Sequence, residues 1–154
     1  MLIEQQKRVL VVDDDPMVRE LLVFVLRRHS LAVDEASDGR EALSLIKANP
    51  YAVIVLDLMM PVLDGFGVLD ALAGPEMPSP PVVLVLTSAD RGDIAHLDPQ
   101  RVHGIMRKPF DPEELASIVV ACAEIRSRNA FETMAIATVL AGSPLLALLN
   151  RFSA

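Results

Sequence analysis

Short apolar runs alternate along the chain with longer segments in which apolar residues recur every three to four positions. Apolar runs rich in β-branched residues are typical of strands buried on both faces of a parallel sheet, whereas the longer spacing is typical of amphipathic helices. Strands alternating with helices predict parallel βαβ units with right-handed crossovers, and therefore an α/β fold with helices on both sheet faces. The five predicted strands cover residues 8–12, 32–36, 53–56, 82–86 and 102–106.

Turn and capping residues set the predicted helices between these strands. Asp15 is the expected N-cap of the first helix and Pro16 lies in its first turn, because an aspartate side chain accepts from the free amides and proline needs no donor there. Few apolar positions fall between Asp90 and Arg101, which predicts only a short or broken helix. The helices are expected at residues 16–29, from the 37–39 turn to 49, at about 66–72, within 90–101 and from 112 to about 126.

Residues that carry chemistry stand where four of the predicted strands end. They are Asp13 and Asp14 after the first strand, Asp57 after the third, Thr87 after the fourth and Lys108 after the fifth. In an open parallel sheet, ligands bind at the edge formed by the carboxyl ends of the strands. Three carboxylates gathered there would raise each other's proton affinity unless a cation lay among them, and the hard, oxygen-preferring ion Mg²⁺ suits them best.

The stretch VIVLDLMMPVLDG, residues 53–65, places Asp57 between a buried strand and a turn. A carboxylate presented at such an edge beside Mg²⁺ is a competent nucleophile toward phosphorus. The Lys108 ammonium and the Thr87 hydroxyl would then contact the phosphoryl oxygens. Asp64 is predicted to form the turn and not to bind a ligand.

Four segments in this order, VLVVDDDP, LDLMMPVLDG, LTSAD and KPF, resemble the receiver domain of two-component response regulators across roughly residues 7–126. The resemblance implies a flavodoxin-like, doubly wound sheet of five parallel strands in the order 2-1-3-4-5. It also implies that Asp57 accepts a phosphoryl group from a sensor histidine kinase or a phosphotransfer protein, with Thr87 and Lys108 contacting that group and a cis peptide bond at Lys108-Pro109. Such a protein is a signalling phosphoacceptor and not an enzyme that turns over a substrate.

The same resemblance implies a set of Mg²⁺ ligands. They are Asp14, Asp57 and the backbone carbonyl of Met59, with Asp13 acting mainly through a metal-bound water. Magnesium keeps several waters and needs few protein ligands, which leaves room for a phosphoryl oxygen.

Two features depart from the family pattern. The family usually carries an aromatic residue three positions before its lysine, and this chain has Ile105 there, so a threonine-to-aromatic activation relay is not expected. The two positions that hold a hydrolytic water in the family are Met59 and Ala89 here. Neither side chain orients water by a hydrogen bond, which predicts a long-lived phosphoryl group.

Two other interpretations fit parts of the sequence. Asp13 and Asp15 have the Asp-x-Asp spacing of haloacid dehalogenase-like phosphatases, but those enzymes have Thr or Val where this chain has Met17. The second alternative is a receiver-fold interaction module that is no longer controlled by phosphorylation, which would not need the full set of strand-end residues. Turnover of a generic phosphomonoester would identify the phosphatase, and a single phosphorylation at Asp57 the response regulator.

Composition and charge narrow the functional class of the protein further. The net charge of −7 argues against a nucleic-acid partner, because such binding normally requires a stripe of Lys and Arg. The single cysteine, Cys122, falls in a helical pattern and is expected to be a small buried hydrophobe. With no cleavable leader pattern at the N-terminus, these features predict a cytoplasmic protein.

The 28 residues after Arg126 are apolar and carry few charges. They are too short for a helix-turn-helix output domain, which predicts a single-domain regulator acting on a downstream protein target. The apolar stretch from Met134 to Leu149 is shorter than the roughly 20 residues of a membrane span, and Gly142-Ser143-Pro144 interrupts it, so no span is expected. We expect the tail, residues 127–154, to form two short helices with a turn at Gly142. Pairing with a second chain as a homodimer is favoured over packing back on the receiver domain.

Overall fold

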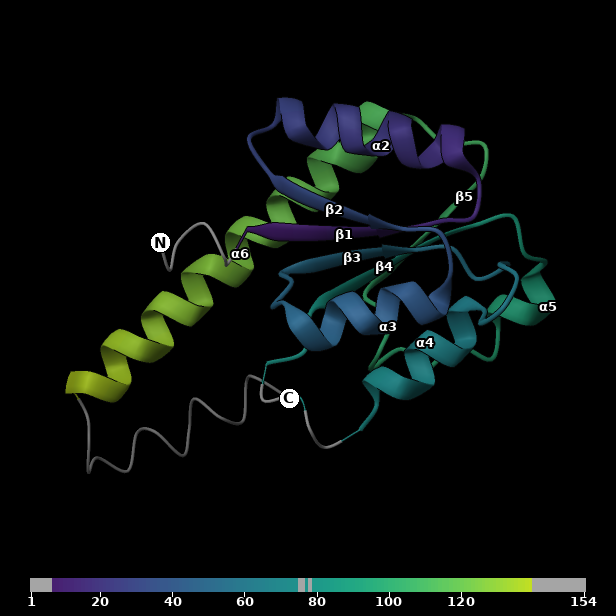
Figure 1. Cartoon of the computed structure of the whole chain (residues 1–154). Helices are drawn as coiled ribbons and strands as arrows, with labels where there is room; N and C mark the ends of the chain where they lie inside the picture. Colours follow the sequence, from purple (N-terminus) through teal and green to yellow (C-terminus); the bar gives the residue numbers. More distant parts are fainter. Residues whose placement is uncertain (1–6, 75–76, 78, 140–154) are drawn as a thin grey trace.

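Five parallel strands form one sheet in the order β2-β1-β3-β4-β5, so the predicted fold class and strand order are confirmed (Figure 1). The computed structural model describes residues 7–74, 77 and 79–139, the last ten as helical backbone. The strands are β1 (Arg8–Val12), β2 (Ala32–Ala36), β3 (Val53–Leu56), β4 (Val82–Thr87) and β5 (Gly104–Arg107). Strand order reverses between β1 and β3, and ligands of such sheets bind beyond this point.

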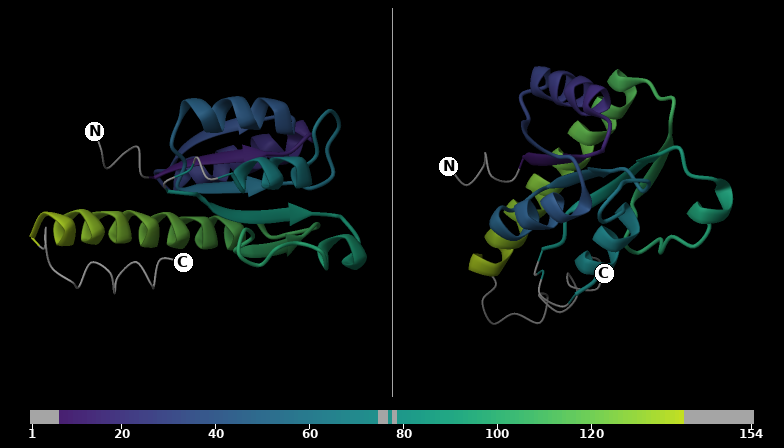
Figure 2. Two further views of the ribbon diagram at one scale, coloured as in Figure 1. Left: turned by 90° about the horizontal axis from the view of Figure 1, so that it is seen from below. Right: turned by 45° about the vertical axis from the view of Figure 1, so that its right-hand side comes forward.

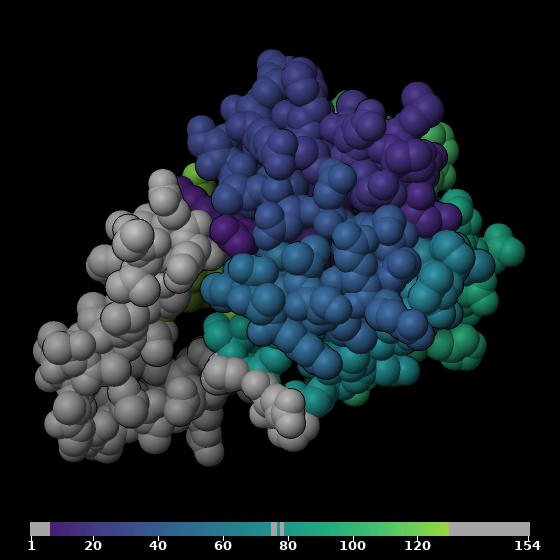
Figure 3. Space-filling model, in the orientation of Figure 1, coloured from purple at the N-terminus to yellow at the C-terminus, as the bar shows by residue number. Residues whose placement is uncertain are grey.

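Helices cover both faces of the sheet. The helices are α2 (Pro16–Arg28), α3 (Gly39–Ala48), α4 (Gly65–Leu72), α5 (Arg91–Ile94) and α6 (Pro112–Val139). Side chains of α2 and α6 share one apolar core with the sheet, and those of α3 and α4 share the other, with α5 at its margin. Figure 2 shows α3 and α6 on opposite sides of the sheet. The space-filling view shows α3 and α4 closing over their side of the sheet (Figure 3).

The two cores follow from the alternation of side chains along each strand. In β1, Val9 and Val11 point into the core beneath α2 and α6, whereas Leu10 and Val12 point into the core beneath α3 and α4. All four are fully buried, as expected for an apolar run in a doubly covered parallel sheet. Truncating a fully buried leucine such as Leu10 to alanine costs about 2–5 kcal/mol.

Two aspartates cap helices, Asp15 as predicted and Asp64 at the turn that it was expected to form. The Asp15 carboxylate accepts a hydrogen bond of 2.9 Å from the Met17 amide at the start of α2. The Asp64 carboxylate accepts one of 2.9 Å from the Gly67 amide and caps α4. Asp64 is therefore a structural residue at a helix start, in agreement with the sequence interpretation.

The end of α6 differs from the sequence prediction. A helix end near Arg126 is wrong, because α6 continues to Val139. The reason is local: after Pro112 the segment contains no glycine or proline until Gly142, so nothing in it stops a helix. The predicted turn at Gly142 lies outside the described residues. None of the helices in the described part of the chain combines the length and apolarity that crossing a bilayer requires.

The region before β5 also differs in detail. The helix α5 has four residues, which confirms the prediction of a short helix. β5 begins at Gly104 and not at Val102, because the Val102 amide donates to the Asp98 carbonyl at 3.1 Å and so belongs to the preceding turn.

Candidate functional site

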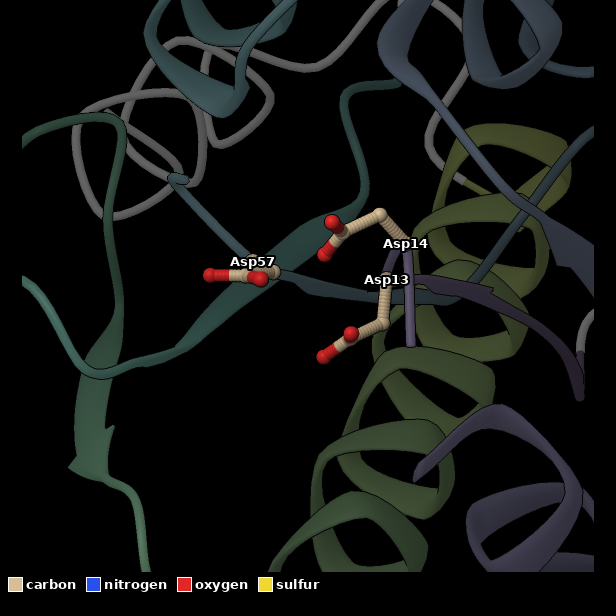
Figure 4. Close-up of side chains that lie close together, drawn as sticks. All are labelled: Asp13, Asp14 and Asp57. Atoms are coloured by element: carbon tan, nitrogen blue, oxygen red, sulfur yellow. The ribbon is translucent and has the colours of Figure 1, made fainter. Parts of the chain in front are cut away.

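The carboxyl edge of the sheet brings the predicted site residues together. Figure 4 shows the side chains of Asp13 and Asp14, from the end of β1, beside that of Asp57, from the end of β3. Thr87 is the last residue of β4, and Lys108 follows β5 directly.

Backbone hydrogen bonds to neighbouring strands hold these residues in place. The Asp57 amide donates to the Val12 carbonyl at 2.9 Å, which extends the pairing of β1 and β3 by one step. In the same way, the Lys108 amide donates to the Thr87 carbonyl at 3.0 Å. Asp57 and Lys108 therefore continue the strand pairing, and their backbones are held by the sheet. The Lys108-Pro109 peptide bond is cis, as the resemblance implied.

One ammonium group bridges two buried carboxylates. Asp13 and Asp57 are 1% and 3% exposed, and Lys108 Nζ lies 2.6 Å from Asp13 Oδ2 and 3.3 Å from Asp57 Oδ2. The other oxygens accept from backbone amides, Asp13 Oδ1 from Asp15 at 2.9 Å and Asp57 Oδ1 from Met59 at 3.1 Å. Both buried carboxylates are thus hydrogen-bonded, as buried charges must be.

Burial and charge shift the ionisation of this cluster. Burial raises the pKa of Asp13, against the opposing effects of the Lys108 hydrogen bond and the Asp15 amide. Burial alone would lower the pKa of Lys108, but its hydrogen bond with Asp13 and the charges of Asp13 and Asp57 outweigh it and raise that pKa. Lys108 therefore stays charged at neutral pH. Three carboxylate groups and one ammonium gather at this edge, and a divalent cation would offset the excess of acidic groups.

The three carboxylates are close enough to share one cation. One oxygen each from Asp13, Asp14 and Asp57 lies within 4.8 Å of the other two. Mg²⁺ uses few protein ligands and keeps several waters, so the three carboxylates would not all need to contact such an ion directly. The donors are all oxygen atoms, which Mg²⁺ prefers. Asp14 is exposed and leaves the cluster open to solvent.

Thr87 is fully buried at the same edge. Its hydroxyl oxygen accepts a hydrogen bond of 3.1 Å from the Ala89 amide, which leaves the hydroxyl proton to donate. Ile105, in β5, is 45% exposed and carries no ring. An activation relay through an aromatic side chain is therefore excluded at this position.

Sequence reasoning missed two residues that shape the site. A Cβ atom on Gly65 would collide with the carbonyl oxygen of Asp57 and lie 2.7 Å from Leu58 Cα, so only glycine fits beside the residue that the sequence singled out. Arg19 Nη1 donates to the main-chain carbonyls of Asp13 at 2.8 Å and Asp14 at 3.2 Å. The Asp64-Gly65 pair is a turn signal and does not by itself indicate a close approach to Asp57. No sequence signal marked Arg19, because an arginine on an amphipathic helix is usually solvated.

Comparison with known proteins identifies the class. Residues 9–120 match the response regulator receiver domain, and the chain belongs to that family. It is 35% identical to the response regulator GtcR of Aneurinibacillus migulanus, over 82% of this chain and 50% of that protein. It is 34% identical to the transcriptional regulatory protein SrrA of Staphylococcus aureus, over 73% of this chain and 46% of that protein. The chain thus spans about half the length of these curated relatives.

Solved structures agree with this assignment. The receiver domain of the Francisella response regulator 1452 is 32% identical with a TM-score of 0.68, over 77% of this chain and 97% of that one. The chemotaxis response regulator CheY4 of Vibrio cholerae is 29% identical with a TM-score of 0.67, over 75% and 97%. The response regulator TrrA of Thermotoga maritima, solved in complex with Mg²⁺-BeF, is 29% identical with a TM-score of 0.66, over 75% and 98%.

Proposed function

We propose that this protein is a phosphoaccepting response regulator in which Asp57 receives a phosphoryl group from a histidine kinase or a phosphotransfer protein. One observation carries the proposal: the buried Asp57 carboxylate lies beside two further carboxylates and one lysine at the carboxyl edge of the sheet. Mg²⁺ would be held by Asp14, Asp57 and the backbone carbonyl of Met59, with Asp13 acting through water. The Thermotoga maritima relative was solved in complex with Mg²⁺-BeF, which supports this choice of ion.

The transfer step uses side chains that are already in position. A carboxylate oxygen of Asp57 attacks the phosphorus of a phosphohistidine, the P–N bond breaks, and the electron pair returns to the imidazole of the donor. The Met59 amide and the Lys108 ammonium hold the two Asp57 oxygens before the attack. Lys108 and the Thr87 hydroxyl then donate to the transferred phosphoryl oxygens. Bound Mg²⁺ supplies positive charge that offsets the repulsion between carboxylates and phosphoryl group.

A partner surface starts at the rim of this edge. Helix α2 follows the acidic residues directly, and three of its large apolar side chains are exposed, Met17 by 78%, Leu21 by 43% and Phe24 by 62%. Their spacing of four and three residues places them on one side of the helix. An exposed apolar stripe of this kind suits a docking protein, and we assign it to the phosphoryl donor. Signalling onward would use contacts with a downstream protein target.

Features of the long helix α6 favour a second copy of the chain as a further binding partner. The far half of α6 extends beyond the amino ends of the strands, away from the phosphoacceptor edge (Figures 1 and 2). Ile118 and Ile125 lie two turns apart on α6 and are 38% and 58% exposed. We propose that residues 7–126 form the receiver domain and that residues 127–154 pair in a homodimer. An isolated helix end gains little stability in water, so a covering partner is expected.

The two alternative functions receive less support. Asp15 is engaged as the N-cap of α2, so it is not free to act as the second aspartate of a phosphatase. An interaction module without phosphorylation would not need Lys108 between two buried carboxylates.

Intact-protein mass spectrometry after incubation with a small phosphodonor tests the proposal. We expect one added phosphoryl group that requires Mg²⁺ and disappears in Asp57→Asn. Asp15→Asn is the matched control, since it alters a neighbouring acid while asparagine keeps the helix cap. Modification that persists in Asp57→Asn, or that proceeds equally in a chelator, would show the proposal to be wrong.

A further inference from the structure

The acidic loop, residues 13–15 between β1 and α2, is held by an arginine from the helix that follows it. Arg19 is half-buried, and its Nη1 donates to the carbonyl oxygens of both Asp13 and Asp14. Both acceptors are main-chain atoms, so the guanidinium leaves the carboxylates free for other ligands. The same loop is fixed at its start by the Asp13 amide, which donates to the Ala36 carbonyl at 3.2 Å.

Asp14 depends on this arrangement more than the other acids do. The carboxylates of Asp13 and Asp57 are buried and are held by Lys108 and by backbone amides. Within the described residues, the Asp14 carboxylate accepts no hydrogen bond, and the residue is exposed. The direction of its side chain is therefore set mainly by its own backbone. That backbone is anchored through its carbonyl to Arg19.

We propose that Arg19 is a positioning residue for the divalent cation, because it holds the acidic loop in the conformation that presents Asp14 to the ion. The inference rests on the proposed function in that the cation is the Mg²⁺ of the phosphorylation site. Arg19 touches neither the ion nor the phosphoryl group. Its effect is exerted through the peptide groups of the ligand residues, as outer-sphere hydrogen bonds exert theirs.

The direction of the change in Mg²⁺ affinity on removing Arg19 distinguishes a positioning role from an effect of its charge. A guanidinium near a cation site repels the cation, so by Coulomb's law alone the removal of Arg19 would tighten Mg²⁺ binding. Loss of positioning acts the other way, because Asp14 then samples directions that do not meet the ion. We expect the loss of positioning to outweigh the loss of charge repulsion, because losing an outer-sphere partner weakens metal binding by roughly tenfold or more.

A Mg²⁺ titration of the unphosphorylated protein, followed by backbone amide shifts in NMR spectra, tests this. Arg19→Ala should weaken Mg²⁺ binding by roughly tenfold. Arg27→Ala is the matched control: Arg27 lies on the same helix, carries the same charge and donates to a main-chain carbonyl, that of Val33 at 3.2 Å, outside the acidic loop. Its affinity should stay within about twofold of wild type, because its charge is distant and screened.

Folding and rescue complete the test. Thermal unfolding without Mg²⁺ identifies the temperature range in which each variant is folded, and affinities are compared only there. Arg19→Lys keeps the charge and one donor group, and it should recover part of the lost affinity. If Arg19→Ala does not fold, Arg19→Lys carries the test alone, since with the charge kept any weakening must come from the altered hydrogen bonds.

The outcomes are distinct. Unchanged or tighter Mg²⁺ binding in folded Arg19→Ala, or wild-type affinity in Arg19→Lys where Arg19→Ala does not fold, overturns the inference and leaves the proposed function standing. If wild type itself fails to bind Mg²⁺, the proposed function fails and the positioning role fails with it.

Discussion

Lys108 Nζ lies 2.6 Å from Asp13 Oδ2, although 95 positions separate the two residues in the chain. The contact joins the end of β5 to the end of β1 across two intervening strands. Asp13 is buried, so this ammonium is what makes its negative charge tolerable in the folded protein.

Removing that ammonium should destabilise the protein and change its response to Mg²⁺. We expect Lys108→Ala to lower the free energy of unfolding by about 2 kcal/mol in Mg²⁺-free buffer, because two buried carboxylates lose their partner. Mg²⁺ should restore more stability to this variant than to wild type, since the ion replaces the missing positive charge. Urea unfolding with and without Mg²⁺ measures both effects. Lys47→Ala, at an exposed position, is the control, and equal stability of the two variants would contradict the prediction.

Gly65 should be intolerant of any side chain. A Cβ atom would meet the carbonyl of Asp57 and the Cα of Leu58, so Gly65→Ala must displace the backbone at Asp57. We expect a loss of about 1–3 kcal/mol in unfolding free energy, as for other overpacked positions, together with slower phosphorylation. Gly92→Ala is the matched control, because its Cβ would meet nothing within 4 Å and alanine favours the helix α5. Similar behaviour of the two variants would count against the close approach at Asp57.

The phosphoryl group should be lost slowly in wild type and faster in Met59→Asn. Met59 is 53% exposed, so the substitution leaves the core intact while adding a group that can orient water toward phosphorus. We expect a several-fold faster loss of the added mass after removal of the phosphodonor. Met17→Asn alters a more exposed methionine on α2, which is 78% exposed, and should have no such effect. A Met59→Asn variant that keeps its phosphate as long as wild type refutes the prediction.

Tyr51 should give a stability difference that depends on pH at the alkaline end. Its hydroxyl donates to Asp34 Oδ2 at 2.7 Å, and burial, with that hydrogen bond and charge, raises the pKa of Tyr51. Wild type should exceed Tyr51→Phe by about 1 kcal/mol in unfolding free energy at neutral pH. Above the ordinary tyrosine pKa of about 10, the unfolded chain ionises while the folded chain stays protonated, so the advantage is lost as pH rises. Urea unfolding of both proteins between neutral pH and pH of about 11 measures it; an advantage that grows with pH contradicts the assignment.

The full chain should sediment as a dimer at tens of micromolar, and a version ending at Arg128 should sediment as a monomer. Among the α6 residues whose side chains the structure describes, Ala123 is the last buried one, and the truncated version keeps it. Far-UV circular dichroism confirms that the shortened protein is folded. A monomeric full-length protein would exclude the dimer and leave packing of the tail against its own domain.

The sequence by itself determined the fold class, the five strands and which polar residues meet at the carboxyl edge of the sheet. These depend on signals that are local along the chain: apolar runs such as residues 53–56, the Asp15 cap before Pro16, and polar residues placed directly after strands. Asp13, Asp57 and Lys108 each follow a strand. Because parallel strands share one carboxyl edge, these positions were enough to predict that the three residues lie close together. The same local signals explain why α5 was expected to be short.

Only the tertiary structure decided which groups touch. The hydrogen bonds of Arg19 to the acidic loop depend on the angle at which α2 leaves β1. The close approach at Gly65 depends on how the loop after β3 folds back against Asp57. Neither contact leaves a periodic pattern in the sequence. Each depends on how close two segments of the backbone lie, and not on the burial of an apolar face. The continuation of α6 past Arg126 left no boundary to detect, because no glycine or proline follows Arg126 before Gly142.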